Sequence, residues 1–93
     1  MATARVRKTV HFSGRVQGVG FRFRTARLAE RFAVEGFVEN LPDGRVRLVI
    51  EADQAEAKRF VAAVGQEMGR LIDATNENES LASGEFAGFG IRR

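Results

Sequence analysis

The sequence contains no cysteine, no tryptophan and no tyrosine, and only one proline and one histidine among its 93 residues. Without cysteine the chain forms no disulfide and offers no thiolate to a metal or to a substrate. A single histidine, His11, is too few for a dedicated zinc or iron centre. We therefore expect no metal and no cofactor, and the chain does not need an oxidising compartment.

Long apolar runs are missing as well. The longest are a few residues, against the roughly 20 needed to cross a bilayer. The segment Met1–Val10 lacks the apolar stretch of a signal peptide. We therefore expect a cytoplasmic protein without membrane contact.

The overall composition is that of an ordinary globular chain, with 44% hydrophobic and 29% charged residues. A chain of this length buries roughly 60 to 70% of its unfolded surface, so we expect one domain over residues 1–93 and a monomer. The net charge of +3 favours anionic ligands. Because the arginines are dispersed among acidic residues, with no run of five or six cations, no nucleic acid is expected as a partner.

A glycine-rich segment is the most informative feature that is present. It covers residues 14–22 with the sequence GRVQGVGFR. An apolar run at Val10–Phe12 precedes it and a helical apolar pattern begins at Phe21, so the segment would lie at a helix N-terminus, where free N–H groups attract anions. Gly18 and Gly20 allow the backbone to turn several N–H groups toward one anion. Arg22 adds a charged fork that can hold two phosphate oxygens.

The glycine spacing differs from the nucleotide-binding fingerprints, because the segment contains neither G-x-x-x-x-G-K-[ST] nor G-x-G-x-x-G. A nucleotide-binding loop is therefore disfavoured. Two interpretations remain open on the residues alone. One is a phosphate cradle, and the other is a plain strand-to-helix turn with Arg22 in solvent.

Two segments together carry a family resemblance. Residues 14–22 and residues 36–46, GFVENLPDGRV, closely resemble the two signature segments of the acylphosphatase family, in the right order and at the usual separation. The similarity in length and element order covers nearly the whole chain, including Gly88–Ile91.

The resemblance implies a metal-independent hydrolase that cleaves the carboxyl–phosphate bond of acyl phosphates to a carboxylate and inorganic phosphate. It implies that Arg22 is the essential arginine and that Asn40 positions the attacking water. Without the resemblance, Asn40 would be assigned to the turn at Leu41–Gly44. The implied phosphate-binding residues are Arg15, Val16, Gln17, Gly18, Val19, Gly20 and Arg22.

The chemistry needs few residue types, because a carboxylate is a weak base and leaves without a general acid. Phosphoryl transfer depends mainly on positioning and charge stabilisation. We expect no covalent intermediate, and we expect His11 to lie on a strand surface. We place Arg15, Arg24 and Arg27 in solvent. A small site with one phosphate anchor should accept many acyl groups.

The apolar periodicity predicts strands and two helices. The first helix should cover residues 21–34, and the second should start at a capping box of Asp53 and Glu56 and stop near Gly69. Residues 71–79 lose their apolar alternation and predict a short, ragged strand, either a weakened edge or part of an extended loop. The remaining strands are predicted at 6–12, 37–41, 45–51 and a final one with Phe86, Phe89 and Ile91.

The order β-α-β-β-α-β predicts an α+β, ferredoxin-like sandwich: a mainly antiparallel four-stranded sheet with two helices on one face. RNA-binding modules share this fold, and Gly20–Phe23 superficially resembles their aromatic motifs. Phe21 and Phe23 would however start a helix rather than lie on the sheet. A third possibility is a regulatory phosphate-binding domain, or one recruited to a carbamoyl-phosphate-processing assembly. Because Arg22 and Asn40 are both present, and the sequence ends at Arg93 without zinc-finger cysteines, we expect a free-standing enzyme.

Overall fold

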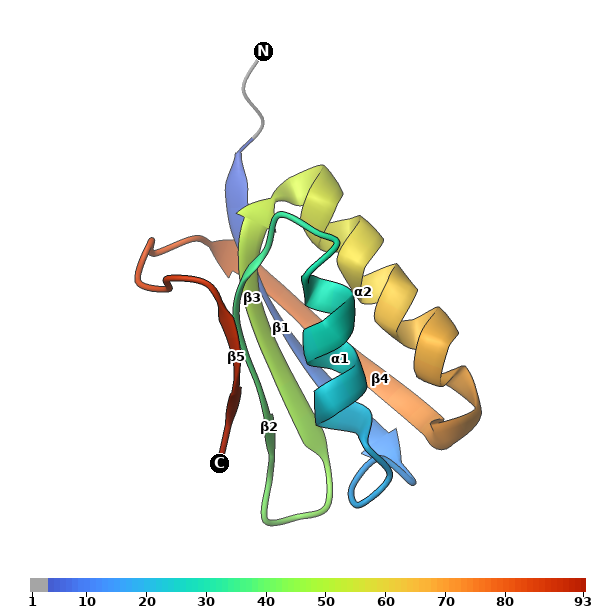
Figure 1. Cartoon of the computed structure of the whole chain (residues 1–93). Helices are drawn as coiled ribbons and strands as arrows, with labels where there is room; N and C mark the ends of the chain where they lie inside the picture. Colours follow the sequence, from blue (N-terminus) through green and yellow to red (C-terminus); the bar gives the residue numbers. More distant parts are fainter. Residues whose placement is uncertain (1–3) are drawn as a thin grey trace.

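A computed structural model describes residues 4–93 of the chain, so the first three residues of the expected domain lie outside the described range. Figure 1 shows two helices packed on one face of a twisted sheet. The strand order is β4-β1-β3-β2-β5. The α+β, ferredoxin-like prediction with both helices on one face is confirmed. The elements are β1 Arg5–Gly14, α1 Phe21–Ala29, β2 Glu35–Asn40, β3 Val46–Asp53, α2 Gln54–Met68, a 3₁₀ turn Gly69–Leu71, β4 Ile72–Leu81 and β5 Phe89–Arg92.

The core lies between the sheet and the helices. Alternate residues of β1, among them Val10 and Phe12, face the helices and are buried, as their period of two predicts. Phe21 of α1 packs on Phe12 with ring centroids 5.2 Å apart, and Phe60 of α2 is fully buried. Among the described residues, neither helix is long and apolar enough to cross a membrane.

The sheet has five strands, not the predicted four. The extra pairing is parallel: β5 lies beside β2, with Ile91 opposite Val38. The predicted final strand also included Phe86, which instead lies in the β4–β5 connection and packs on Phe37 with ring centroids 5.7 Å apart. Gly88, at φ 75°, separates this connection from β5.

The β4 strand is longer and more regular than predicted. It covers ten residues and pairs antiparallel with β1 along its length, so the prediction of an edge strand is confirmed and that of a short strand or loop is wrong. The apolar alternation is missing because β4 lies at the edge and its side chains are mostly exposed. Glu77 and Glu79 accept ion pairs from Lys8 of β1 at 3.2 Å each, which replaces apolar packing there.

Two helix boundaries also differ from the prediction. The α1 helix ends at Ala29 rather than at residue 34, because Phe32 reaches the core from the following turn and packs on Phe60 at 5.3 Å between ring centroids. The capping box is wrong: Asp53 makes no side-chain cap hydrogen bond. The Glu56 carboxylate accepts a hydrogen bond from the Ala33 N–H at 2.8 Å instead. The predicted stop at Gly69 is confirmed.

A buried carboxylate fixes the β4–β5 connection on the face of the sheet opposite the helices. Glu51 of β3 is only 1% exposed and accepts hydrogen bonds from the N–H groups of Ser83 and Gly84, both at 2.8 Å. The Arg7 guanidinium pairs with it at 2.9 Å. Burial alone would raise the pKa of Glu51, but these donors lower the pKa to about 2. The connection that leads into β5 is therefore held by a charged group.

Candidate active site

The glycine-rich loop and the β2–β3 turn lie at the same end of the sheet, beside the N-terminus of α1 (Figure 1). The loop, the start of α1, the end of β2 and the C-terminal residues of the chain line an open cleft of about 500 Å³. The structure thus brings together segments that are far apart in the sequence. The cleft is lined by Val16, Gly18, Gly20, Phe21, Arg22, Phe23, Asn40, Ile91 and Arg93.

The backbone of the loop has the conformation expected of an anion cradle. Gly18 and Gly20 have φ values of 75° and 80°, which side chains with a Cβ rarely adopt. Gly20 is the residue before α1, and the first turn of that helix has no acidic side chain. Within residues 4–93, no backbone N–H of positions 16–20 donates a hydrogen bond to a carbonyl oxygen. These donors are available at a helix N-terminus, where a negative charge is stabilised.

The other predicted loop residues have different surroundings. The Arg15 N–H donates to the Leu71 carbonyl at 2.9 Å, so this donor is already used, and the Arg15 side chain is exposed outside the cleft lining. Val16 is buried beneath the loop and contributes to the cleft floor. Val19 is exposed at the loop tip and does not line the cleft.

Gln17 has a contact that the sequence analysis missed. Its side-chain N–H₂ group donates to the carbonyl oxygens of Leu41 and Arg45, at 2.8 and 2.9 Å. These two carbonyls flank the turn between β2 and β3, and Asn40 immediately precedes it. The amide of Gln17 therefore fixes the loop to the hairpin that carries Asn40. No sequence signal indicated this bridge, because the partners are backbone atoms.

Arg22 and Asn40 both line the cleft, although 17 positions of sequence lie between them. Arg22 lies in the first turn of α1, and none of the ion pairs among residues 4–93 includes it. Asn40 ends β2. Its Oδ1 atom is buried and has no hydrogen-bond partner within the described residues. A buried acceptor of this kind normally receives a hydrogen bond, and other atoms of the same residue line the cleft.

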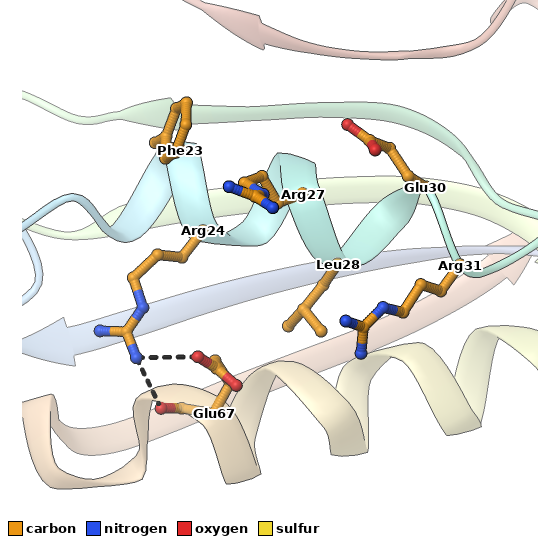
Figure 2. A pocket seen from close by; sticks show the side chains of 7 residues that line it. All are labelled: Phe23, Arg24, Arg27, Leu28, Glu30, Arg31 and Glu67. Carbon is orange, nitrogen blue, oxygen red and sulfur yellow. Dashed lines mark hydrogen bonds and ion pairs between the residues drawn. The ribbon is translucent and has the colours of Figure 1, made fainter.

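The neighbouring basic residues belong to a different surface. Figure 2 shows Arg24 directed at Glu67 of α2, with which it forms an ion pair at 2.8 Å. Arg24, Arg27 and Arg31 line a second cleft of about 340 Å³, between the two helices. Arg24 and Arg27 are exposed and do not line the cleft at the glycine-rich loop, which we call the phosphate-loop cleft; this agrees with their assignment to solvent.

His11 projects from β1 on the face opposite the helices, as its register beside Arg47 of β3 shows. Its pKa is lowered by burial and by the positive charges of Arg45 and Arg47. His11 does not line the cleft. Within residues 4–93, no group of three or more histidine, aspartate or glutamate side chains is placed to hold a metal ion.

The chemistry of the cleft is that of an anion site with a nearby acceptor for water. Donors are supplied by backbone N–H groups and by the guanidinium of Arg22, which forms no ion pair among residues 4–93, and the amide side chain of Asn40 belongs to the same cleft. This combination suits a phosphoryl group that is attacked by water. The RNA-binding alternative is not favoured, because Phe21 is buried in the core and Phe23 lies on a helix rather than on the sheet.

Comparison with known proteins agrees with this geometry. The acylphosphatase family profile matches residues 8–91. An acylphosphatase of Rubrobacter xylanophilus is 44% identical over 92 residues, covering 97% of this chain and 81% of that protein. An acylphosphatase of Pseudomonas aeruginosa is 38% identical over 90 residues, covering 97% of this chain and 99% of that protein.

The fold comparison leads to the same family. The crystal structure of acylphosphatase from Bacillus subtilis superposes with a TM-score of 0.85 and 28% sequence identity. The match covers 95% of this chain and 99% of the Bacillus chain. With the profile match over residues 8–91, these similarities show that the chain belongs to the acylphosphatase family.

Proposed function

We propose that this protein hydrolyses the carboxyl–phosphate bond of small acyl phosphates, with Arg22 and the loop N–H groups holding the phosphoryl group. Asn40 orients a water molecule for in-line attack on phosphorus. In the reaction the water oxygen forms a new bond to phosphorus, while the bond from phosphorus to the acyl oxygen breaks. The carboxylate leaves with the bonding electron pair, and the protons of water pass to phosphate and solvent.

The proposal depends mainly on one observation: Gly18, Gly20, Arg22 and Asn40 line a single cleft. The cleft supplies positive charge where the equatorial phosphate oxygens carry negative charge. The carboxamide oxygen of Asn40, which has no protein partner in the described residues, can accept a hydrogen bond from the attacking water. The carboxylate product is stable as an anion, so the cleft needs no general acid.

The test is hydrolysis of benzoyl phosphate by the purified protein in EDTA, with inorganic phosphate as a competing ligand. Arg22→Ala should lower kcat/KM at least about 1,000-fold and weaken phosphate inhibition, because it removes a charged bidentate donor. Arg31→Ala is the matched control, since Arg31 lines the second cleft and not this one. It should keep the activity of the unaltered protein.

Two results would contradict parts of the proposal. Turnover that survives in Arg22→Ala would exclude Arg22 as the phosphate anchor. Phosphate binding without turnover in the unaltered protein would support the alternative of a regulatory phosphate-binding domain. Circular dichroism of each variant separates these results from a loss of folding.

We also propose that residues 1–93 act as one domain, as a monomer, in the cytoplasm. Within residues 4–93 the buried apolar residues from Val6 to Met68 form one cluster, which supports one domain. The complete lack of cysteine fits a reducing compartment. Sedimentation equilibrium tests the monomer, and fractionation of cells that express the protein tests the cytoplasmic location.

A further inference from the structure

Large apolar side chains are exposed at few places on residues 4–93, and two of them line the phosphate-loop cleft. The exposed set is Val19 at 39%, Phe23 at 60%, Leu81 at 83% and Ile91 at 42%. Phe23 and Ile91 line the cleft together with Arg22 and Asn40. They come from different elements, Phe23 from the first turn of α1 and Ile91 from β5. Exposed apolar groups gathered around a few polar ones are typical of a ligand site.

The cleft is larger than a phosphoryl group requires. A phosphoryl group with its attacking water occupies a few times the roughly 30 Å³ of one water molecule. The cleft measures about 500 Å³. The remaining space lies beside apolar side chains, so it suits a part of the substrate that carries no charge.

We propose that Phe23 and Ile91 form an acyl subsite that selects acyl phosphates with an apolar ring over those with a small acyl group. This inference rests on the proposed function and adds a substrate class to it. A ring that leaves water for Phe23 and Ile91 gains apolar contact, whereas an acetyl group is too small to cover both. The sequence alone predicted that many acyl groups are accepted, because Phe23 and Ile91 are 68 positions apart and show no local pattern.

Neighbouring contacts hold Phe23 at the border between two clefts. Phe23 also lines the second cleft, where Figure 2 shows it beside Arg27. The guanidinium carbon of Arg27 lies over the Phe23 ring, 5.9 Å from its centroid, within the range of a cation–π contact. This contact favours one orientation of the ring, so the ring forms a wall between the acyl subsite and the basic surface of α1.

The position of the opposite wall is set by the pairing of β5 with β2. Ile91 pairs with Val38 in the parallel register of β2 and β5, two residues before the end of β2 at Asn40. One substrate can therefore place its acyl group between Phe23 and Ile91 and its phosphoryl group near Arg22 and Asn40 at the same time. An acyl group with a distal carboxylate would behave differently. Its carboxylate would be stabilised by the positive charge of Arg27 rather than by apolar contact with Phe23.

The experiment compares benzoyl phosphate with acetyl phosphate, which share the reacting carboxyl–phosphate bond and differ in the acyl group. The unaltered protein should prefer benzoyl phosphate in kcat/KM. Phe23→Ala should reduce the ratio of the two kcat/KM values roughly tenfold, the effect of a lost apolar contact in a pocket. Ile91→Ala should reduce the ratio less, and Phe23→Leu should restore part of it. Leu81→Ala, at the exposed end of β4, is the matched control and should leave the ratio unchanged.

The outcomes separate the subsite from the proposed function. If neither substrate is hydrolysed, the proposed function fails. If both are hydrolysed and the ratio is the same in Phe23→Ala as in the unaltered protein, the subsite is wrong and the function stands. An equal loss for both substrates, with weaker phosphate inhibition, would assign Phe23 to the phosphate cradle instead. A preference for succinyl phosphate that depends on Arg27 would also overturn the inference.

Discussion

Replacing Glu51 by glutamine tests whether a buried charge holds the β4–β5 connection. The carboxylate accepts hydrogen bonds from two backbone N–H groups of the connection, from the Ser83 hydroxyl and from Arg7. Glutamine keeps one acceptor oxygen, replaces the other by a donor, and leaves the Arg7 guanidinium with Glu85 as its one remaining charged partner among the described residues. When one partner of a buried hydrogen-bond network is removed, the groups left unpaired cost more stability than the intact network contributes.

The magnitude follows from the pKa of Glu51, which lies at about 2 against an ordinary value of 4.5. This difference corresponds to about 3 kcal/mol of stability that the ionised carboxylate adds to the folded state. Because the pKa is lower in the folded state, the contribution is complete above pH 4.5 and is lost as the pH falls toward 2. At neutral pH Glu51→Gln should therefore lower the free energy of unfolding by about 3 kcal/mol.

The assay is urea unfolding followed by circular dichroism, since the sequence has no tryptophan or tyrosine for intrinsic fluorescence. The stability difference between Glu51→Gln and the unaltered protein should shrink steadily from pH 5 to about pH 2. Glu35→Gln is the matched control, because Glu35 forms an exposed pair with Arg5 on the same sheet and should cost less than about 1 kcal/mol. A Glu51→Gln difference that is small at pH 7, or the same at every pH, would refute the reasoning.

Two further predictions concern the active site. Asn40→Ala should lower kcat about 100-fold while phosphate inhibition is largely kept, because in the proposed mechanism the amide orients water rather than phosphate. Steady-state kinetics with phosphate as inhibitor measures both effects. An equal loss of phosphate affinity would contradict this role. Gln17→Ala should lower kcat about tenfold and the free energy of unfolding by about 1 to 2 kcal/mol, because two hydrogen bonds from the loop to the hairpin are lost. Urea unfolding and benzoyl phosphate kinetics measure both effects, and unchanged kcat in a destabilised Gln17→Ala would limit Gln17 to a structural role.

The fold was predictable where burial imposes a period on the sequence. In β1 and β3 alternate residues face the helices, so Val10, Phe12 and Leu48 indicated their strands directly. The two edge strands were predictable only in part, because burial imposes no clear period on them. The β4 strand carries Glu77 and Glu79 on its helix side, paired with Lys8, so no apolar alternation remains to be detected. The final strand was predicted at Phe89 and Ile91, but Phe86 was wrongly included, because it gives the same apolar signal from the connection on the opposite face of the sheet.

The site was predictable to the extent that it depends on local backbone chemistry. Gly18, Gly20 and Arg22 lie within one loop and helix start, so their spacing indicated a phosphate cradle beside the alternative of a plain turn, and the family resemblance decided between them. Asn40 came only from the family resemblance, because a residue before a turn has a simpler explanation. The contacts of Gln17 and the cleft position of Ile91 depend on the tertiary arrangement, and no spacing in the sequence indicates them.

The position of Ile91 connects the stability of the connection to the proposed selectivity of the site. The β5 strand is an edge strand of four residues, so its own pairing with β2 holds it only weakly. It follows directly from the connection that Glu51 anchors, and its far end carries Ile91 into the cleft. If Glu51 loses its charge, the connection loosens and one wall of the acyl subsite becomes less well placed. The glycine-rich loop between β1 and α1, the proposed phosphate site, makes no contact with that anchor among the hydrogen bonds of residues 4–93. Glu51→Gln should therefore lose part of its preference for benzoyl phosphate over acetyl phosphate while it keeps its phosphate binding.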